Sequence, residues 1–460
     1  MKKYDAIVIG SGQAGTPLSK KLAESGLKTA LIEQRWVGGT CVNDGCSPTK
    51  AMIASGRVAY LARKGKEMGI TTGKVKVDIA TILARKNEIV QRMRGNSEEA
   101  IKKTKGLDLI YGVASFSNPK EIMVKLNDGG ETLLSAEKIF INTGAKPSIP
   151  VIEGIEDIDY LTSTTILDLK DIPDHLLIVG SGYVGLEFGQ MYRRFGSKVT
   201  LLSRSERLMS KEDKDISEEL EAILTQEGIR ILTNCKLQSF EKAGQQIKAS
   251  FLKNGKKTML TCSHVLIAAG RTPQTDNLNL KVTGVKTDEK GYVQVNGFLE
   301  TTTKGIFALG DVNGGPPFTH IAFDDYRIAI HNLTKGTKLS TKNRVLPYCM
   351  FTDPQLGRVG LTEHEAREKG FDVLVASMPN SAVARAIETG DTRGMMKAVV
   401  DAKTDKILGA SILGTEGGEV VSVLQMAMIG DIKWQEVHDS VFAHPTFSES
   451  LNNLFMFPDK

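Results

Sequence analysis

The stretch that decides the fold is Asp5-Ala6-Ile7-Val8-Ile9-Gly10-Ser11-Gly12-Gln13-Ala14-Gly15. Its apolar half predicts a short buried strand over residues 5–10. A helix is expected next, because hydrophobic side chains recur on one helical face at Leu18, Leu22 and Ala23. Gly26 would end this helix, and Thr29–Glu33 predicts a second strand. Strand, glycine turn, helix and strand make up the βαβ unit of a dinucleotide-binding domain.

The glycines and one acid give this unit its chemistry. Gly10 allows a tight turn, Gly12 lets the backbone approach a pyrophosphate, and Gly15 lets the helix pack closely on the strand. The helix N-terminus offers free N–H groups to the phosphates. Glu33 follows about 20 residues later, where a carboxylate binds ribose hydroxyls. We expect FAD at this site, because Gly310-Asp311 ends a distant strand with a second carboxylate for the hydroxyls of a long cofactor.

The same pattern returns in a second βαβ unit. His175–Val179 predicts a strand, Gly180-Ser181-Gly182-Tyr183-Val184-Gly185 a turn, residues 186–195 a helix, and Lys198–Leu202 the next strand. No acid follows this strand, where Ser203, Arg204 and Arg207 stand instead. Arginine binds a 2′-phosphate that an acid would repel, so the site favours NADPH over NADH. The alternative is that the arginines are surface residues that pair with Glu206 or Glu212.

Composition sets limits on the class of protein. A length of 460 residues predicts about three domains, and 41% hydrophobic residues can bury large cores. The net charge of +5 is small and scattered, which argues against nucleic-acid binding. No apolar run of about 18 residues could cross a membrane. Five cysteines form no secreted disulfide framework, so we expect a cytoplasmic protein.

Cys41 and Cys46 lie close together behind Gly38-Gly39-Thr40, shortly after the first βαβ unit. In the cytoplasm such a pair is more typical of catalysis than of structure, and its position suggests a disulfide that faces a flavin. The two thiolates could also bind Hg(II) or Cu(I) transiently. No structural metal site is predicted, because Cys262-Ser263-His264 lacks further ligands. The remaining cysteines are expected to be small buried hydrophobic residues at Cys235, Cys262 and Cys349.

Gly38-Gly39-Thr40-Cys41-Val42-Asn43-Asp44-Gly45-Cys46-Ser47-Pro48-Thr49-Lys50 resembles the redox segment of the FAD-dependent pyridine nucleotide–disulfide oxidoreductases. Thr143-Gly144-Ala145 and Ala269-Gly270-Arg271-Thr272-Pro273 resemble the family's domain-crossing turns. His444-Pro445-Thr446, with Glu449, resembles its C-terminal catalytic segment. The resemblance covers nearly the whole chain. It implies an α/β protein with two doubly wound Rossmann-like nucleotide-binding domains and a C-terminal α+β dimerisation domain.

The expected boundaries are residues 1–149 for the FAD-binding domain and 150–275 for the NAD(P)H-binding domain. Residues 276–345 would complete the FAD site, and residues 346–460 would form the dimer interface. The implied FAD contacts are Gly10, Gly12, Gly15, Glu33, Gly39, Thr40, Thr143, Gly144, Gly310 and Asp311. The implied NADPH contacts are Gly180, Gly182, Tyr183, Gly185, Arg204, Arg207 and Gly270.

The resemblance also implies catalytic roles. Cys41 would be the interchange thiol that attacks the substrate, and Cys46 the thiol that faces the flavin. His444 would be the acid–base, contributed by the other subunit of a homodimer and oriented by Glu449. Lys50 and Glu187 would form a pair near the flavin ring. Tyr183 would cover the nicotinamide site, although it could also serve packing alone.

Several segments indicate the electron acceptor. Phe351-Thr352-Asp353-Pro354-Gln355 and Asp391-Thr392-Arg393-Gly394 look like mercuric reductase. Residues 137–144, 324–328 and 448–452 look like the reactive-chlorine-resistance copper(II) reductases. We therefore expect electrons to pass from NADPH through flavin and the Cys41–Cys46 disulfide to a metal ion, Hg(II) or Cu(II), or to a disulfide. The last residues, 457–460, hold no cysteine pair of the mercuric reductase kind, so mercury reduction is expected to be inefficient.

Three other functions stay open at this point. The first is a low-molecular-weight disulfide reductase similar to glutathione reductase, and the second is a dihydrolipoamide dehydrogenase. Ser203 and Arg204 depart from the acid that is usual in the second of these. The third is a non-enzymatic metal or thiol buffer, which would need no hydride source and therefore no second nucleotide site.

Overall fold

A computed structural model describes residues 1–457 and divides the chain into two compact units. Unit 1 comprises Met1–Ala51, Ala80–Ser148 and Gly270–Arg344. Unit 2 comprises Met52–Ile79, Ile149–Ala269 and the residues from Val345 on. Each unit is thus assembled from stretches that lie far apart in the sequence. The finer division into four segments, at residues 149, 275 and 345, stays a prediction.

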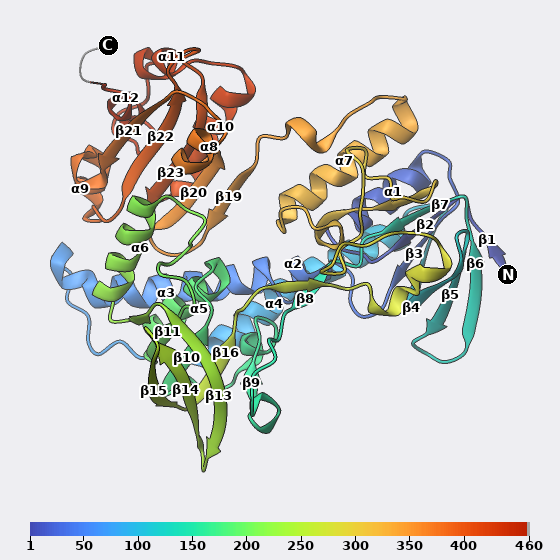
Figure 1. The fold of residues 1–460 in the computed structure, drawn as a ribbon, viewed down its shortest axis with the longest axis horizontal. Coiled ribbons are helices and arrows are strands. Elements are labelled where there is room, and N and C mark those ends of the chain that lie inside the picture. The colour runs from blue at the N-terminus through green and yellow to red at the C-terminus, as the bar shows by residue number, and fades with distance from the viewer. Residues whose placement is uncertain (458–460) are drawn as a thin grey trace. The chain divides into compact units, whose positions relative to one another are not determined.

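Unit 1 is built on an eight-stranded sheet in the order β1-β6-β5-β4-β3-β2-β7-β18 (Figure 1). Its parallel part contains β4 (Leu107–Asn118), β3 (Thr29–Glu33), β2 (Ala6–Ile9), β7 (Lys138–Ile141) and β18 (Ile306–Ala308). An antiparallel extension contains β5 (Glu121–Leu126) and β6 (Glu131–Ser135), and β1 (Lys2–Lys3) pairs with β6. Since β2 is the middle strand of the parallel part, the glycine turn lies at its carboxyl edge, where doubly wound sheets bind ligands.

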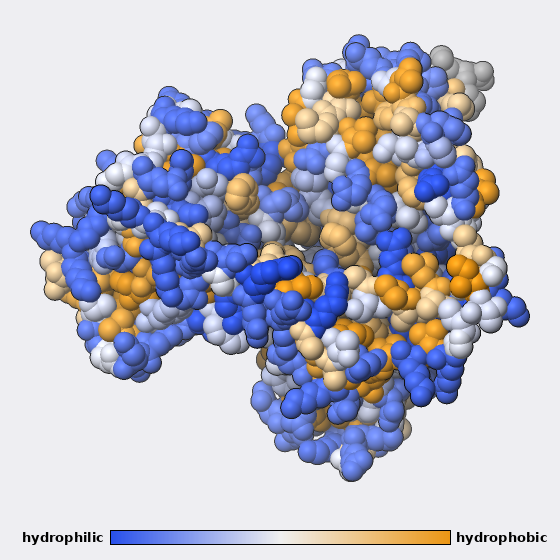
Figure 2. All heavy atoms as spheres, turned by 180° about the vertical axis from the view of Figure 1, so that it is seen from behind, coloured by the Kyte–Doolittle hydropathy of each residue, from blue (hydrophilic) through white to orange (hydrophobic). Residues whose placement is uncertain are grey.

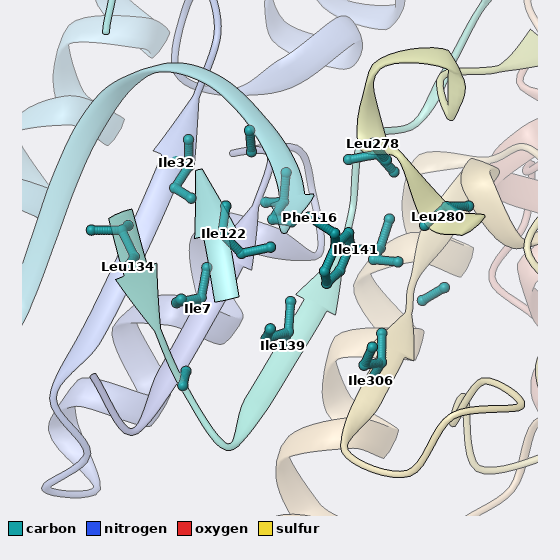
Figure 3. Packing of buried hydrophobic residues seen from close by; sticks show 14 of the residues in the cluster. Ile7, Ile32, Phe116, Ile122, Leu134, Ile139, Ile141, Leu278, Leu280 and Ile306 are labelled. Atoms are coloured by element: carbon teal, nitrogen blue, oxygen red, sulfur yellow. The ribbon is translucent and has the colours of Figure 1, made fainter. Parts of the chain in front are cut away.

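Hydrophobic cores cover both faces of β2. Ala6 and Val8 share a core with Leu18 of α1 (Gly15–Glu24) and Ile328 of α7 (Thr319–Lys335). The intervening residues, Ile7 and Ile9, belong to a second core on the other face. Figure 3 shows this second core, in which strand residues meet η4 (Asp276–Leu278) and η5 (Leu280–Val282). Burial on both faces explains why β2 is a continuous apolar run.

Unit 2 contains the second nucleotide-binding fold. Its parallel sheet has the order β12 (Arg230–Leu232), β11 (Lys198–Leu202), β10 (His175–Val179), β16 (His264–Ile267) and β9 (Tyr160–Leu161). The helices α5 (Tyr183–Phe195) and α6 (Lys214–Gln226) follow β10 and β11 in the chain. An antiparallel sheet of β13 (Cys235–Ala243), β14 (Gln246–Lys253) and β15 (Lys256–Cys262) precedes β16. This arrangement repeats the nucleotide-binding topology of unit 1.

The last part of unit 2 is an antiparallel sheet in the order β19 (Pro347–Met350), β20 (Gln355–Gly360), β23 (Ile407–Gly414), β22 (Met395–Asp401) and β21 (Val373–Pro379). Its helices are α8 (Glu363–Glu368), α9 (Ala384–Thr389), α10 (Gly417–Ile429), α11 (Trp434–Asp439) and α12 (Ser450–Leu454). Hydrophobic residues also gather on its outer surface (Figure 2). Met426 is 62% exposed and Val441 99% exposed, as expected of a surface that binds another chain.

The fold class is confirmed. Three strands, β3, β10 and β11, have the bounds that the sequence predicted. One expectation about the cysteines is wrong, because Cys349 is half-buried whereas Cys235 and Cys262 are buried. Cys349 lies on β19, which is the edge strand of its sheet and therefore has a neighbour on one side alone. None of the helices in residues 1–457 is long and apolar enough to span a membrane.

Candidate active site

The short helix α2 and the first residue of the longer helix α3 present the thiol pair. Cys41 lies in α2 (Gly39–Asn43), and Cys46 is the first residue of α3 (Cys46–Lys64). Cys46 is exposed, and its Sγ lies 3.2 Å from Oγ1 of Thr319, the first residue of α7. A helix N-terminus favours a thiolate, and a hydroxyl donor stabilises it further. Cys46 is therefore placed to hold the negative charge of the reduced pair.

Cys41 has a different environment. The pKa of its thiol is raised, first by its hydrogen bond with Cys46, then by burial and by the charge of Cys46. The Thr319 hydroxyl and the Lys50 ammonium act in the opposite direction. A negative charge on Cys46 makes a second charge on Cys41 unfavourable. The two thiols thus lie in unequal surroundings, and a charge on Cys46 disfavours a charge on Cys41.

The redox segment folds as it does because α2 packs directly on the first glycine turn. Gly39 has φ +61°, and a Cβ atom there would lie 2.7 Å from the Cα of Gly12. Thr40, which follows, is exposed and accepts the backbone N–H of Asp44 at 2.9 Å. Two glycines in contact therefore bring the thiols and the predicted pyrophosphate site together.

Side chains outside the pair brace the segment between the two cysteines. Asn43 Nδ2 donates to the carbonyl oxygens of Val37 and Gly39 at 3.0 and 2.9 Å. Arg94 Nε donates to Asn43 Oδ1 at 2.8 Å. Arg35 pairs with Asp44. These contacts fix the bend between α2 and α3, and hence the direction of each sulfur.

The first glycine turn is closed by Asn142. Gly10 has φ +99°, and a Cβ there would lie 2.4 Å from the carbonyl oxygen of Asn142. Asn142 Nδ2 donates to Gly10 O at 3.1 Å. A Cβ on Gly15 would lie 1.9 Å from Gly10 O. Gly12, between them, leaves the N-terminus of α1 open to a phosphate.

Two carboxylates lie at or just beyond the carboxyl ends of parallel strands of unit 1, Glu33 at β3 and Asp311 after β18. Glu33 accepts the N–H and the hydroxyl of Ser11 at 3.0 and 2.6 Å. Asp311 lies 3.7 Å from Arg271 Nε, and burial raises the pKa of its carboxyl while Arg271 opposes that rise. Thr143 Oγ1 is buried, and it has no hydrogen-bond partner within residues 1–457. Gly144, the next residue, has φ +70° and open space beside it.

These features fit FAD. The first glycine turn would hold the pyrophosphate, and Glu33 and Asp311 would bind hydroxyls of the ribose and the ribityl chain. The buried Thr143 hydroxyl needs a hydrogen-bond partner, which the cofactor would supply. Gly310, beside Asp311, donates its N–H to Asp325 Oδ2 at 2.8 Å. Asp325 is buried and is paired with Arg344 at 2.7 Å.

The second glycine turn, in unit 2, repeats this geometry. Gly180 has φ +124°, and its Cβ would lie 2.3 Å from the carbonyl oxygen of Ala268. A Cβ on Gly185 would lie 2.5 Å from Gly180 O. Gly182 caps α5 and has open space around it, and the half-buried Tyr183 begins the helix. Gly270 belongs to unit 1, where its carbonyl accepts Ser148 N at 2.9 Å.

The arginines of the second site follow β11. Arg204 is exposed, and it forms no hydrogen bond or ion pair with any residue that the structure describes. Arg207 is half-buried and donates to Ser210 O at 3.4 Å. The proposed partner Glu212 pairs with Arg358 instead, so this alternative to phosphate binding is wrong for Glu212. Neither Arg204 nor Arg207 forms an ion pair with any residue that the structure describes.

His444 and Glu449 lie together in unit 2. His444 Nδ1 lies 2.9 and 3.0 Å from the two carboxylate oxygens of Glu449. Thr446 orders this segment by accepting Glu449 N at 3.1 Å and donating to Ala443 O at 2.9 Å. The His444 side chain is 69% exposed. Glu449 thus orients the ring through Nδ1, and Nε2 has no partner among the described residues.

The predicted Lys50–Glu187 pair is divided between the two units. Lys50 lies in α3, where its charge acts on Cys41. Glu187 is buried in α5 and accepts the backbone N–H of Phe351 at 2.8 Å. Their interaction stays a prediction.

Sequence reasoning assigned no role to Asn142, Thr319 and Asp325. Asn142 and Asp325 fell within segments noted for their resemblance, but their side chains gave no local signal. Each makes its contact with a residue more than ten positions away. In the sequence, the one hint of a role for these three residues was that each lies near a glycine, a predicted turn or the start of a helix.

Comparison with known proteins identifies the family of the chain. The family model for pyridine nucleotide-disulphide oxidoreductases matches residues 4–325, and that of the family's dimerisation domain matches residues 346–455. A mercuric reductase from Staphylococcus aureus is 38% identical over 457 residues, which cover 99% of this chain and 83% of the relative. The probable pyridine nucleotide-disulfide oxidoreductase RclA from Escherichia coli is also 38% identical, with 99% of both chains covered.

A solved structure agrees with these matches. The Cu(II) complex of the HOCl-induced flavoprotein disulfide reductase RclA from Escherichia coli superposes with a TM-score of 0.91, at 38% identity and 99% coverage of both chains. A dihydrolipoyl dehydrogenase from Thermus scotoductus is 34% identical over 458 residues. The dimerisation domain supports a homodimer. The chain therefore belongs to the pyridine nucleotide-disulphide oxidoreductases, as an enzyme that uses FAD and NAD(P)H.

Proposed function

We propose that this enzyme passes electrons from NADPH through FAD and the Cys41–Cys46 disulfide to a metal ion, with Cu(II) as the first substrate and Hg(II) as the second. The observation that carries the proposal is the full-length likeness to a flavoprotein solved as a Cu(II) complex. Paired thiolates are soft ligands that suit Cu(I), the product of that reduction. One NADPH would reduce two Cu(II) ions to two Cu(I) ions and leave NADP⁺ and one proton.

The residues of the chain divide the work. The first glycine turn, Glu33 and Asp311 would hold FAD, which would supply the means to take a hydride from NADPH and to deliver an electron pair to the disulfide. Cys46, supported by Thr319, holds the negative charge, while the more basic Cys41 engages the acceptor. His444, oriented by Glu449, takes the proton of the Cys41 thiol from across the dimer interface. A role for Lys50 and for Glu187 near the flavin ring stays a prediction.

The cofactor is proposed to be NADPH in preference to NADH. Arg204 and Arg207 follow β11, where a 2′-phosphate would lie and an acid would select NADH. The four-segment domain division, with FAD bound by residues 1–149 and 276–345 and NADPH by residues 150–275, belongs to the same proposal. A cytoplasmic location stays a prediction from cysteine usage and composition.

A competition of acceptors tests the proposal. The FAD-loaded enzyme is supplied with NADPH and with Cu(II), Hg(II), glutathione disulfide or lipoamide, and kcat/KM is measured for each. Cu(II) should give the highest value, with Cu(I) trapped by a chromogenic chelator, and Cys41→Ser should abolish turnover while the protein remains yellow. A higher kcat/KM for glutathione disulfide would establish the low-molecular-weight disulfide reductase instead. A higher value for lipoamide would establish the dehydrogenase.

A further inference from the structure

Residues 203–213, here called the cofactor loop, carry both arginines proposed to bind the 2′-phosphate. The first half of the loop is tied to the second glycine turn. Ser203 Oγ lies 2.8 Å from Ser181 Oγ, and Met209 donates its N–H to Ser181 O at 3.1 Å. Met209 has φ +43°, a backbone angle that residues other than glycine rarely adopt without support from their surroundings. The loop is therefore held in one unusual conformation next to the phosphate-binding turn.

The other end of the loop is anchored by a buried ion pair. Glu212 Oε2 lies 2.9 Å from Arg358 Nε, and the two side chains are 2% and 4% exposed. Tyr348, on the edge strand β19, donates its hydroxyl to Glu212. Arg358, on β20, also donates to the carbonyl oxygen of Ala410 at 2.8 Å, so that its guanidinium cannot turn freely. The end of the loop is thereby fixed to the C-terminal sheet.

The next residue adds a second anchor. Asp213 accepts the backbone N–H groups of Glu363 and His364 at 3.0 and 3.3 Å, at the start of α8. Lys397, on β22, places its Nζ 3.3 Å from Asp213. Two consecutive residues of the cofactor loop are thus held by three strands of the C-terminal sheet, β19, β20 and β22, and by the helix α8.

A buried ion pair is weak evidence for stability, because the loss of hydration offsets much of the attraction, whereas fixing one arrangement is a better-attested use. We propose that Glu212 and Arg358 are positioning residues for cofactor selection, which hold the cofactor loop so that Arg204 and Arg207 meet the 2′-phosphate of NADPH. The inference rests on the proposed use of NADPH. It adds that residues of the dimerisation domain, remote in sequence from the nucleotide site, set its selectivity.

The test compares two arginines of unit 2 that are equally buried. Arg358→Met removes the anchor. Arg194→Met is the matched control, because Arg194 is also 4% exposed and pairs with Asp353 and Glu227 at 2.7 Å, outside the loop. The FAD-loaded variants are assayed for kcat/KM with NADPH and with NADH, and for the affinity of 2′,5′-ADP, while Tm is measured alongside.

Both variants should lose thermal stability, but Arg358→Met alone should change selectivity. Its NADPH-to-NADH ratio of kcat/KM should fall about tenfold, the effect of losing one charge-assisted hydrogen bond. The affinity for 2′,5′-ADP should fall in parallel, and the control should keep the wild-type ratio within roughly twofold. An equal loss with both cofactors in Arg358→Met would overturn the inference, because the pair would then be structural.

If Arg358→Met does not fold, a milder variant tests the same anchor. Tyr348→Phe removes the hydroxyl that donates to Glu212 and should lower the NADPH-to-NADH ratio of kcat/KM about threefold. An unchanged ratio in the folded variant would count against the anchor. The two proposals fail differently. A wild-type enzyme that shows no preference for NADPH contradicts the proposed cofactor, whereas a wild-type preference that survives in both variants contradicts the anchor alone.

Discussion

At the scale of single residues, Cys41 and Cys46 differ through their neighbours. Cys46 begins a helix and faces the Thr319 hydroxyl, while Cys41 is half-buried and hydrogen-bonded to Cys46. Identical thiols thus have different surroundings, set by a helix terminus, one hydroxyl and one charged neighbour. This difference is the basis of the proposal that Cys46 holds the charge and Cys41 meets the acceptor.

Thr319→Val should make Cys41 less reactive in the reduced protein. The Thr319 hydroxyl lowers the pKa of Cys41, so its removal raises that pKa and reduces the thiolate fraction at a given pH. Alkylation of Cys41 by iodoacetamide at pH 8 should slow about fivefold, the worth of one hydrogen bond. Mass spectrometry of the alkylated peptide measures the rate. Thr319→Ser, which keeps the hydroxyl, should retain the wild-type rate, and equal rates in all three proteins would exclude a role for this hydroxyl.

The same scale shows what the sequence could not predict. The glycines of both turns were identifiable, because a tight turn and a close approach to phosphate require that residue type in a fixed spacing. Asn142, Thr319 and Asp325 are ordinary polar residues whose partners lie on other elements. Their roles depend on which elements the fold brings together, and no local pattern specifies such contacts.

At the scale of elements, α2 depends on its contact with the first glycine turn. Gly39→Ala should destabilise this contact, because its Cβ would meet Gly12 and its φ is +61°. Unfolding free energy should fall by about 2 kcal/mol and bound flavin should decrease. Urea titration and the ratio of flavin to protein absorbance measure the two effects.

Gly26→Ala is the control for that variant. Gly26 has φ +88° but no atom within 4 Å of a Cβ, so it isolates the effect of the left-handed backbone. It should cost about 1 kcal/mol and leave flavin binding intact. Equal flavin loss in the two variants would mean that backbone strain, and not contact with Gly12, accounts for the effect of Gly39→Ala.

His264, the first residue of β16, should make the stability of unit 2 sensitive to acid. Burial lowers the pKa of His264, so between that lowered value and the ordinary value of about 6.5 the unfolded chain binds more protons than the folded one. Stability should therefore fall as the pH falls from 7 to 5. The effect of one half-buried ring should stay below about 1 kcal/mol, because solvent screens it. His264→Gln should flatten the pH dependence of the urea midpoint, and an unchanged slope would contradict this assignment.

Local patterns explain why several elements were predictable. β3, β10 and β11 were predicted to the residue, because each is an apolar run bounded by turn residues. α2 was not predicted, since five residues that include one cysteine and one glycine show no helical periodicity. Packing against another element stabilises α2, as is usual for helices too short to be stable alone.

At the scale of the whole molecule, activity should require two chains. His444 is exposed in a single chain, and its family's dimerisation domain supports a homodimer. Mixing equal amounts of Cys41→Ala and His444→Ala proteins gives hybrids in half of the dimers, each with one intact site. After subunit exchange, about a quarter of wild-type activity should return. Exchange is verified by mass spectrometry, and no recovery after it would place His444 with the Cys41 of its own chain.

Unit 1 has a consequence for synthesis of the chain. Its three stretches end at residues 51, 148 and 344. The two stretches that separate them, Met52–Ile79 and Ile149–Ala269, belong to unit 2. A ribosome that has made the first glycine turn must therefore translate the entire second nucleotide fold before β18, Asp311 and α7 emerge. Until then the nascent chain holds Glu33 without Asp311, the second carboxylate proposed to bind FAD hydroxyls, and its Cys46 has no Thr319 beside it. Cofactor capture and maturation of the thiol pair are therefore expected late in translation, however early their sequence motifs leave the exit tunnel.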